Sequence, residues 1–224
     1  MTPPVSKVKL NDTCRLIPSR YPAVGILDVV ASPEDLHLIF ELEGWTNDRI
    51  SAEVGIVRQI PREEWVTGRS MASVVMASFC HPGLKGSRFN GPDRGAWYAA
   101  FILITAHRVA IYHRTEELAE IGVLETRVQV RLYFADFQAA FHDVRAMLPG
   151  NEPYHRTDSY EESQGLSREL LESGSNGILY RSVRRPGGEC IACFRPPLVL
   201  NVKLGPHFEY RWHGTREPKL RKLG

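Results

Sequence analysis

The sequence of 224 residues lacks most features that mark membrane, secreted or nucleic-acid-binding proteins. Its longest apolar stretch, residues 96–106, falls well short of the roughly 18 residues that indicate a membrane span. The first residues contain no apolar segment of the kind found in signal peptides, so we expect a cytoplasmic protein without membrane contact. The formal net charge of +2 is too small to indicate nucleic-acid binding by itself.

Cysteine is scarce as well, with four residues in the whole chain, too few for a disulfide framework at this length. Cys190 and Cys193 form one C-x-x-C pair, which raises the alternative of a metal or redox site. A tetrahedral zinc site needs two more ligands, for which Cys80-His81 is the one hint. Residues three apart on a strand point to opposite faces. We therefore expect buried, reduced cysteines and no metal.

The chain also lacks the motifs of the common hydrolases, kinases and nucleotide-binding enzymes: G-x-S-x-G, G-x-x-x-x-G-K, H-E-x-x-H and G-x-G-x-x-G. No repeat, low-complexity tract or Gly/Ser linker divides it. We therefore predict a single α+β domain with mixed or antiparallel sheets flanked by helices. Residues 1–12 are expected to be a loose arm, 13–204 the domain, and 205–224 a strand with a basic tail.

Hydrophobic periodicity and capping signals predict the elements of this domain. Helices are predicted from Ser32 to Gly44, near Thr46, over 104–120 and over 159–172. Residues 70–79 fit a buried helix or a buried strand equally well. Strands are predicted over 14–17, 126–134 and 208–212, with strand, turn and strand over 87–100 and a hairpin over 178–183 and 190–194.

The end of the chain is basic, with five Lys or Arg residues and one acid, Glu217, between Arg211 and Gly224. Such a run can contact phosphates. It is more often a solvated terminus. We therefore expect no direct nucleic-acid binding.

Three polar residues stand in apolar surroundings where a ligand would explain them: Arg88, Tyr98 and Ser182. Arginine pairs bidentately with phosphate, an aromatic face stacks on a flat cationic ring, and a hydroxyl orients a sugar. Each residue also has a purely structural explanation. The arginine stem could cover Trp97, the tyrosine could be a core aromatic with its hydroxyl satisfied, and the serine could cap the hairpin.

Several separated motifs resemble the RES domain, in the right order along the chain. They are Ser87-Arg-Phe-Asn90, Gly95-Ala-Trp-Tyr98, Thr105-Ala106, Tyr112-His-Arg114, Asp158-Ser-Tyr160, Ser163-Gln164, Gly177-Ile-Leu-Tyr-Arg-Ser-Val-Arg184, Gly187-Gly188 and Cys193-Phe-Arg-Pro196. This resemblance implies a fold similar to ADP-ribosyltransferases and the activity of bacterial toxins that destroy NAD, some by phosphorolysis. It also implies an antitoxin partner, often with a DNA-binding domain.

The resemblance places the family arginine at Arg88, the tyrosine at Tyr98 and the serine at Ser182, with Tyr160 and His113 as weaker candidates. Valine stands at position 109, where the family has a glutamate. A carboxylate there would stabilise the transition state of glycosidic cleavage, and valine cannot.

The leading hypothesis is an enzyme that consumes NAD as its substrate, needs no other cofactor, and cleaves the nicotinamide–ribose bond. In this hypothesis Arg88 clamps the pyrophosphate, Tyr98 packs on the nicotinamide and Ser182 orients the ribose. The alternative is a RES fold that binds without catalysis. The sequence does not decide whether water, phosphate or a protein side chain accepts the ADP-ribosyl group. It also does not decide whether the protein forms a homo-oligomer.

Overall fold

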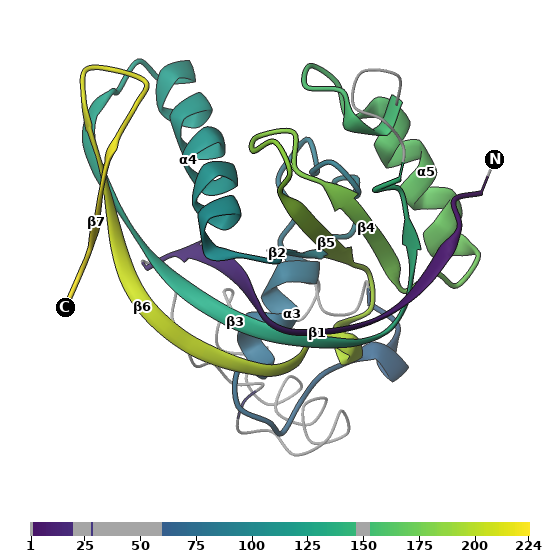
Figure 1. Ribbon diagram of the computed structural model, residues 1–224. Coiled ribbons are helices and arrows are strands. Elements are labelled where there is room, and N and C mark those ends of the chain that lie inside the picture. Colours follow the sequence, from purple (N-terminus) through teal and green to yellow (C-terminus); the bar gives the residue numbers. More distant parts are fainter. Residues whose placement is uncertain (1, 20–27, 29–59, 147–152) are drawn as a thin grey trace, which may run out of the picture.

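The structure is a computed structural model that describes residues 2–19, 28, 60–146 and 153–224. Its elements, labelled in Figure 1 where there is room, are β1 (Val5–Pro18), η2 (Arg62–Glu64), α3 (Ala72–Cys80), β2 (Trp97–Ala100), α4 (Leu103–Glu120), β3 (Glu125–Asp143), η3 (Pro153–His155), α5 (Glu161–Glu172), β4 (Gly177–Arg181), β5 (Glu189–Cys193), η4 (Pro196–Leu198), β6 (Leu200–His213) and β7 (Lys219–Lys222). The predicted helices that begin at Ser32 and near Thr46 lie outside the described residues.

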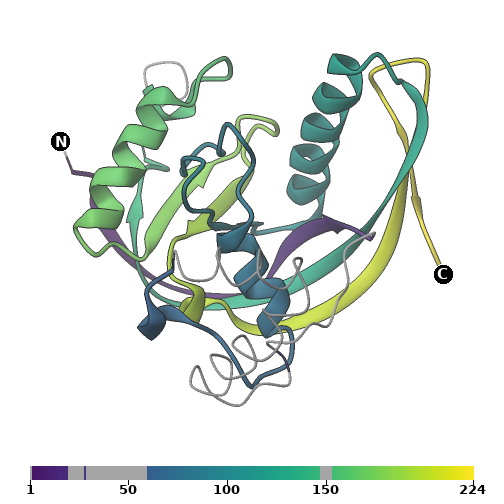
Figure 2. The ribbon, with the colours of Figure 1, turned by 180° about the vertical axis from the view of Figure 1, so that it is seen from behind.

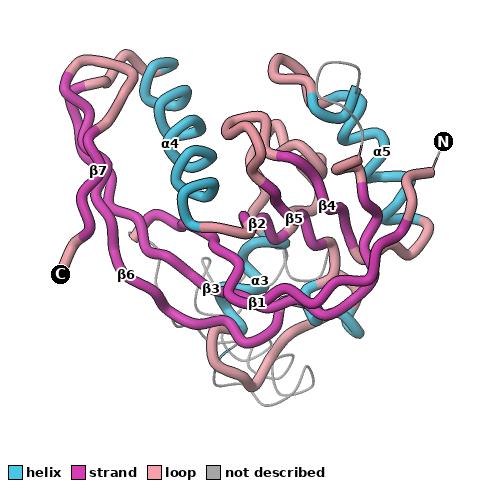
Figure 3. Tube along the Cα trace, in the orientation of Figure 1, coloured by secondary structure: helices cyan, strands magenta, loops and turns pink. Residues whose placement is uncertain are grey.

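The seven strands form one mixed sheet in the order β1-β2-β5-β4-β3-β6-β7. Only the pairing of β3 with β4 is parallel among the described strands. Because β1 also pairs with β3, the first five strands of this order form a closed ring of pairings. The long strands β1, β3 and β6 curve side by side beneath α4, α5 and the β4–β5 hairpin (Figures 1 and 3). The predicted single α+β domain with a mixed sheet is confirmed.

Two hydrophobic cores lie on the two faces of the sheet. One contains α3 with Trp97 and Phe137, and the other contains Phe89, Tyr180 and Trp212 beside α4 and α5. Figure 2 shows α3 from behind, on the other side of the strands from α4 and α5. Side chains of β5 alternate between these cores, with Ile191 and Cys193 in the first and Cys190 and Ala192 in the second. The two cysteines of the C-x-x-C pair therefore point to opposite faces, as predicted, and all four cysteines are buried and free.

Most of the elements predicted from periodicity are present. The helices over 104–120 and 159–172 correspond to α4 and α5, and the hairpin to β4 and β5. Gly174, with φ +85°, follows α5 and favours its end. The ambiguous segment 70–79 is the helix α3. The predicted strand at Ser87 is wrong, because that segment makes one isolated bridge between Ser87 and Asn90.

Both ends of the chain correct the predicted boundaries. The loose arm predicted for residues 1–12 is wrong from Val5 onward, because Val5 begins β1 and lies opposite His142 of β3. The basic tail is also ordered, since β7 pairs antiparallel with β6. The backbone N–H and C=O groups of each end bond to a neighbouring long strand, so they do not depend on water for hydrogen bonds. Within the described residues, no helix is long and apolar enough to cross a membrane.

Candidate functional site

Arg88 lies in a tight turn between Ser87 and Asn90, whose backbone groups bond to each other at 2.9 and 3.3 Å. Gly86 precedes the turn with φ +67°, and a Cβ there would come within 2.1 Å of the Asn90 carbonyl oxygen. Only glycine fits this approach. The turn therefore has one backbone path, which carries Arg88 and Phe89 at its tip.

Three elements hold this turn in place. The Tyr98 hydroxyl on β2 accepts a hydrogen bond from the Phe89 N–H at 2.9 Å and donates one to Asn90 Oδ1 at 2.8 Å. The Phe89 ring packs edge-on against Tyr180 of β4, with centroids 4.9 Å apart. From α5, the Gln164 amide donates to the Ser87 carbonyl at 2.9 Å. Tyr98 thus positions the residues around Arg88, and its hydroxyl is satisfied within the protein.

The Arg88 side chain is buried, with 7% of the residue exposed. Its Nη1 donates to the carbonyl oxygens of Tyr154 at 3.0 Å and Arg156 at 2.8 Å. Its guanidinium lies 4.8 Å above the Tyr160 ring, in the range of a cation–π contact. Burial is the main cause that lowers the pKa of Arg88. No carboxylate forms an ion pair with it in the described part of the chain, so its positive charge has no counter-ion there.

Ser182 lies at the end of β4, where its N–H donates to the Gly188 carbonyl at 2.8 Å. Its Oγ accepts a hydrogen bond from the Arg184 N–H at 3.2 Å. Ser182 therefore caps the hairpin, which was the structural explanation considered from the sequence. The hydroxyl also reaches the Cys190 thiol. Burial raises the pKa of Cys190 to about 12, and hydrogen bonds with Tyr180 and Ser182 and the charge of Arg88 oppose the rise. Ser182 therefore lies beside Cys190, whose pKa also responds to the charge of Arg88.

The hairpin faces α4 through two arginines. Arg185 Nη1 lies 3.4 Å from the Thr105 hydroxyl, and the Arg184 guanidinium lies 3.4 Å above the Tyr112 ring. Position 109 is one helical turn from both Thr105 and Tyr112, so Val109 lies on the face of α4 that the hairpin meets. Val109, where the resemblance predicts a glutamate, therefore lies on the side of α4 that faces the hairpin after Ser182.

Positive charge dominates this region. Desolvation, followed by the charges of Arg184, Arg114 and Arg88, lowers the pKa of His113 to about 4, although the residue is exposed. Burial, with Arg88 and Arg181, lowers the pKa of His155 to about 4. Both histidines are therefore neutral at physiological pH. The fixed charges that remain are guanidinium groups, which favour an anionic ligand.

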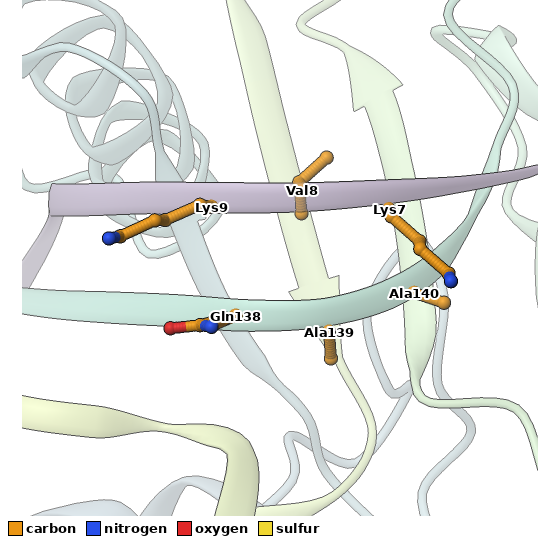
Figure 4. A pocket seen from close by; sticks show the side chains of 6 residues that line it. All are labelled: Lys7, Val8, Lys9, Gln138, Ala139 and Ala140. Carbon is orange, nitrogen blue, oxygen red and sulfur yellow. The ribbon is translucent and has the colours of Figure 1, made fainter.

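Two hollows of about 470 Å³ each lie elsewhere on the described surface, the second beside Tyr154, whose carbonyl accepts a bond from Arg88. One is a shallow strip between β1 and β3 lined by Lys7, Lys9 and Gln138 among others (Figure 4). The other lies along α5 beside Tyr154 and Gly165. Neither is lined by Arg88, Tyr98 or Ser182. We place the candidate site by the convergence of side chains, because the strip in Figure 4 has no buried polar group. In the described residues, no cluster of His, Cys, Asp or Glu could hold a metal ion.

The structure brings together the residues that the sequence proposed: Arg88, Tyr98, Tyr160 and Ser182. Their roles toward a ligand stay predictions. Sequence reasoning missed Gln164 and Arg184, which fix the turn and join the hairpin to α4. Both stood within the family-like motifs, and that was the one signal that could have found them.

Comparison with known proteins places this site in a family context. A family model described as "RES domain" matches residues 56–213. An uncharacterized protein of Sinorhizobium fredii (strain NBRC 101917 / NGR234), y4oC, is 27% identical over 208 residues, which cover 90% of this chain and 83% of that protein. A chain in the crystal structure of the M. tuberculosis MbcT–MbcA toxin–antitoxin complex is 14% identical, with a TM-score of 0.49, and the match covers 92% of this chain and 87% of that one.

Proposed function

Because the chain belongs to the RES domain family, we propose that it binds NAD and breaks the nicotinamide–ribose bond, as the toxin of a toxin–antitoxin pair. The observation that carries the proposal is Arg88, a buried guanidinium without a carboxylate partner among the described residues. A buried charge is costly unless it is paired. The pyrophosphate of NAD would supply the missing negative charge in bidentate geometry.

Each residue of the cluster has a role in this proposal. Arg88 Nη1 is occupied by two carbonyl groups, so Nε and Nη2 are left to bind the pyrophosphate. The Ser182 hydroxyl accepts a bond from Arg184, and its own proton would turn from Cys190 to the ribose when NAD binds. The rings of Tyr98 and Tyr160 would border the nicotinamide and its ribose. When the glycosidic bond breaks, nicotinamide leaves with the bonding electron pair and becomes neutral. Water or phosphate then adds to the ribose carbon and loses a proton.

The experiment is a nicotinamide-release assay on the purified full chain with NAD, run with and without inorganic phosphate and paired with calorimetric titration of NAD. Release that needs phosphate would identify phosphorolysis, and release in its absence would identify hydrolysis. Labelled NAD added to a cell lysate would reveal transfer to protein. Absence of both binding and release would overturn the proposal.

A second candidate function is favoured by Val109. Valine on the α4 face that meets the hairpin cannot stabilise an oxocarbenium-like ribose, which a carboxylate would do. The protein would then be a RES fold that binds NAD without cleaving it. The same pair of measurements separates the two candidates, because NAD binding without nicotinamide release identifies the binding module.

The proposal includes an antitoxin that covers the Arg88 site, with a DNA-binding domain of its own, in a cytoplasmic complex. Family membership supports this partner. Arrest of growth on expression of this chain, relieved by co-expression of an adjoining gene, would support the toxin role. Unaffected growth together with measured NAD turnover would contradict the toxin role and leave the enzymatic proposal intact.

A further inference from the structure

The outward face of β3, β6 and β7 carries a concentration of positive charge. Alternation along β6 directs Tyr210 and Trp212 into the core beside α4, so the residues between them point away from that core. The same alternation and the strand pairings place five cations on this face: Arg127 and Arg131 of β3, Arg211 of β6, and Lys219 and Arg221 of β7. Two carboxylates, Glu125 and Glu209, share it, so five positive and two negative charges leave a local net charge of +3.

Three of these cations stand in one row across the strands. Arg127 lies directly opposite Arg211, and Arg211 lies directly opposite Lys219. Neighbouring strands are about 4.8 Å apart. Like charges that face each other across strands destabilise a sheet. Nothing in the fold requires this arrangement at exposed positions, so a ligand that neutralises the row explains it better than stability does.

The carboxylates of this face reach one end of the row only, at Arg127. Glu209 is buried and lies 4.0 Å from Arg127 and 3.5 Å from Arg221. Glu125 lies 3.7 Å from His213. In the described part of the chain no ion pair reaches Arg211 or Lys219, and both are exposed. The charged groups of Arg211 and Lys219 are therefore accessible to an anion from solvent.

We propose that this basic face binds the phosphodiester backbone of double-stranded nucleic acid. Four of its five cations are arginines, whose planar donors match phosphate oxygens. The remaining outward positions hold Gln129, His207 and His213, and Leu223, whose N–H donates to the His207 carbonyl at 2.8 Å, is the one apolar side chain beside them in the described chain. A protein partner would need an apolar centre to its interface, whereas phosphate contacts need only the cations. Among its described residues the face carries no Phe, Tyr or Trp, and the bases of a duplex stay stacked on one another, so binding through phosphates is independent of sequence.

This site is separate from the proposed NAD site. Phe89, Tyr180 and Cys190, which surround Arg88, belong to the core on the opposite face of the sheet. The basic face also depends on β7, which the sequence predicted to be a solvated tail. Pairing with β6 aligns the tail cations with those of β6 and β3, and this alignment creates the row.

The test is fluorescence anisotropy of labelled 30-bp duplexes of mixed sequence, DNA and RNA in separate arms, titrated with the full chain over a series of salt concentrations. Five phosphate contacts predict a slope of about −4.5 for log Kobs against log salt on DNA. The double variant Arg211→Gln/Lys219→Gln should reduce the slope by about 1.8 and weaken binding about tenfold or more near 0.1 M salt. The matched control is Lys7→Gln/Lys9→Gln, which removes the same charge from exposed residues of β1 (Figure 4).

The proposal is supported if either duplex binds with this salt dependence and only the β6–β7 variant changes the slope. It is overturned if neither duplex binds near 0.05 M salt, or if both double variants weaken binding equally. Tighter binding of polyglutamate than of either duplex would also overturn it and assign the face to an acidic protein partner. Melting curves show whether the variants are folded, and NAD titration reports on the Arg88 site independently.

Discussion

At the scale of single residues, Arg88 is the side chain that most strongly indicates a bound ligand. Moving an ion from water into a protein interior costs several kcal/mol before compensation. Two carbonyl oxygens and the Tyr160 ring offset part of this cost, but they leave the charge itself unneutralised within the described residues. A fold that needed only packing at this position would gain stability from an apolar side chain. We therefore read Arg88 as a residue kept for binding.

Arg88→Ala should weaken NAD binding about ten- to a hundredfold, because a charge-assisted contact contributes about 1.5–3 kcal/mol. Ser182→Ala should cost less, since its hydroxyl is neutral. Calorimetric titration measures both. The control is Arg156→Ala, which removes a neighbouring, exposed arginine paired with Asp158. Equal NAD affinity in wild type and Arg88→Ala would show that this arginine is not the pyrophosphate clamp.

Val109→Glu should raise the rate of nicotinamide release. One electrostatic group that acts on the transition state contributes about 2.7–4 kcal/mol, which corresponds to a hundred- to a thousandfold in rate. The hairpin arginines Arg184 and Arg185 face this side of α4, so a new carboxylate would have cations nearby. The same cations could hold it away from the ribose, and that would reduce the gain.

The control for this variant is Val109→Gln, which has nearly the same shape without the charge. Burial of an unpaired carboxylate destabilises a protein, so melting curves are needed for all three proteins. A folded Val109→Glu protein with the turnover of Val109→Gln would mean that another residue does the work of the family glutamate, or that this protein never cleaves NAD.

At the scale of elements, the sequence predicted what is encoded locally. The helix α4 and the β4–β5 hairpin follow from periodicity, turn residues and caps within each segment. Only residues 14–17 of β1 were predicted, because the strand pairs with β3 more than 100 residues away. The strand β7 was missed although it forms a local hairpin with β6, because its sequence Lys219-Leu-Arg-Lys222 is too polar to stand out as a strand. The site divides in the same way. Arg88, Tyr98 and Ser182 stood out by their local setting, whereas Gln164 fixes the Ser87 turn from 77 residues away.

An ion triad joins three separate elements beneath the site. Glu64 of η2 pairs with Arg94 and, at 2.5 Å, with Arg195, and all three side chains are mostly buried. Arg195 also donates to the Leu171 carbonyl at 3.0 Å and to the Ser175 carbonyl at 3.1 Å, at the end of α5. The triad thereby ties η2 to the segment after β5 and to the helix that supplies Gln164.

Arg195→Ala should lower the free energy of unfolding by about 2–4 kcal/mol, because it leaves Glu64 with one partner and uncaps the end of α5. For a chain of this size the melting temperature should fall by roughly 4–16 °C. Arg156→Ala is the matched control, since its ion pair with Asp158 is exposed and screened by solvent. Equal melting temperatures for the two variants would show that the triad does not hold the elements together.

At the scale of the whole molecule, the sheet separates two regions of positive charge. Arg88, Arg184 and Arg185 lie on one side, and the row of Arg127, Arg211 and Lys219 lies on the other. The formal net charge of +2 hides this arrangement, because acids elsewhere balance the cations. An overall charge therefore says little about binding when a fold gathers charges of one sign. The arginines around the candidate site also lower the pKa values of the histidines beside it.

The stability of the protein should fall as the pH decreases from 7.5 to 5. His155 is 8% exposed, and its Nε2 accepts a hydrogen bond from the Arg181 N–H at 3.2 Å, which requires the neutral ring. Burial, with Arg88 and Arg181, lowers its pKa from 6.5 to about 4. The unfolded chain therefore binds a proton through this window while the folded protein does not, so acid favours unfolding. The loss from His155 is about 2 kcal/mol, or roughly 4–8 °C in melting temperature.

The variant His155→Gln keeps an acceptor for Arg181 but cannot titrate, so its melting temperature should change less than that of wild type between the two pH values. A residual decrease should remain, because the pKa values of His107, His113 and His142 are lowered as well. Comparing the change between two pH values, rather than the melting temperatures themselves, cancels any packing cost of the substitution. His81→Gln, at an exposed position, serves as the control. If His155→Gln loses as much stability as wild type, then His155 is already charged in the folded protein, and the cationic surroundings inferred for Arg88 are wrong.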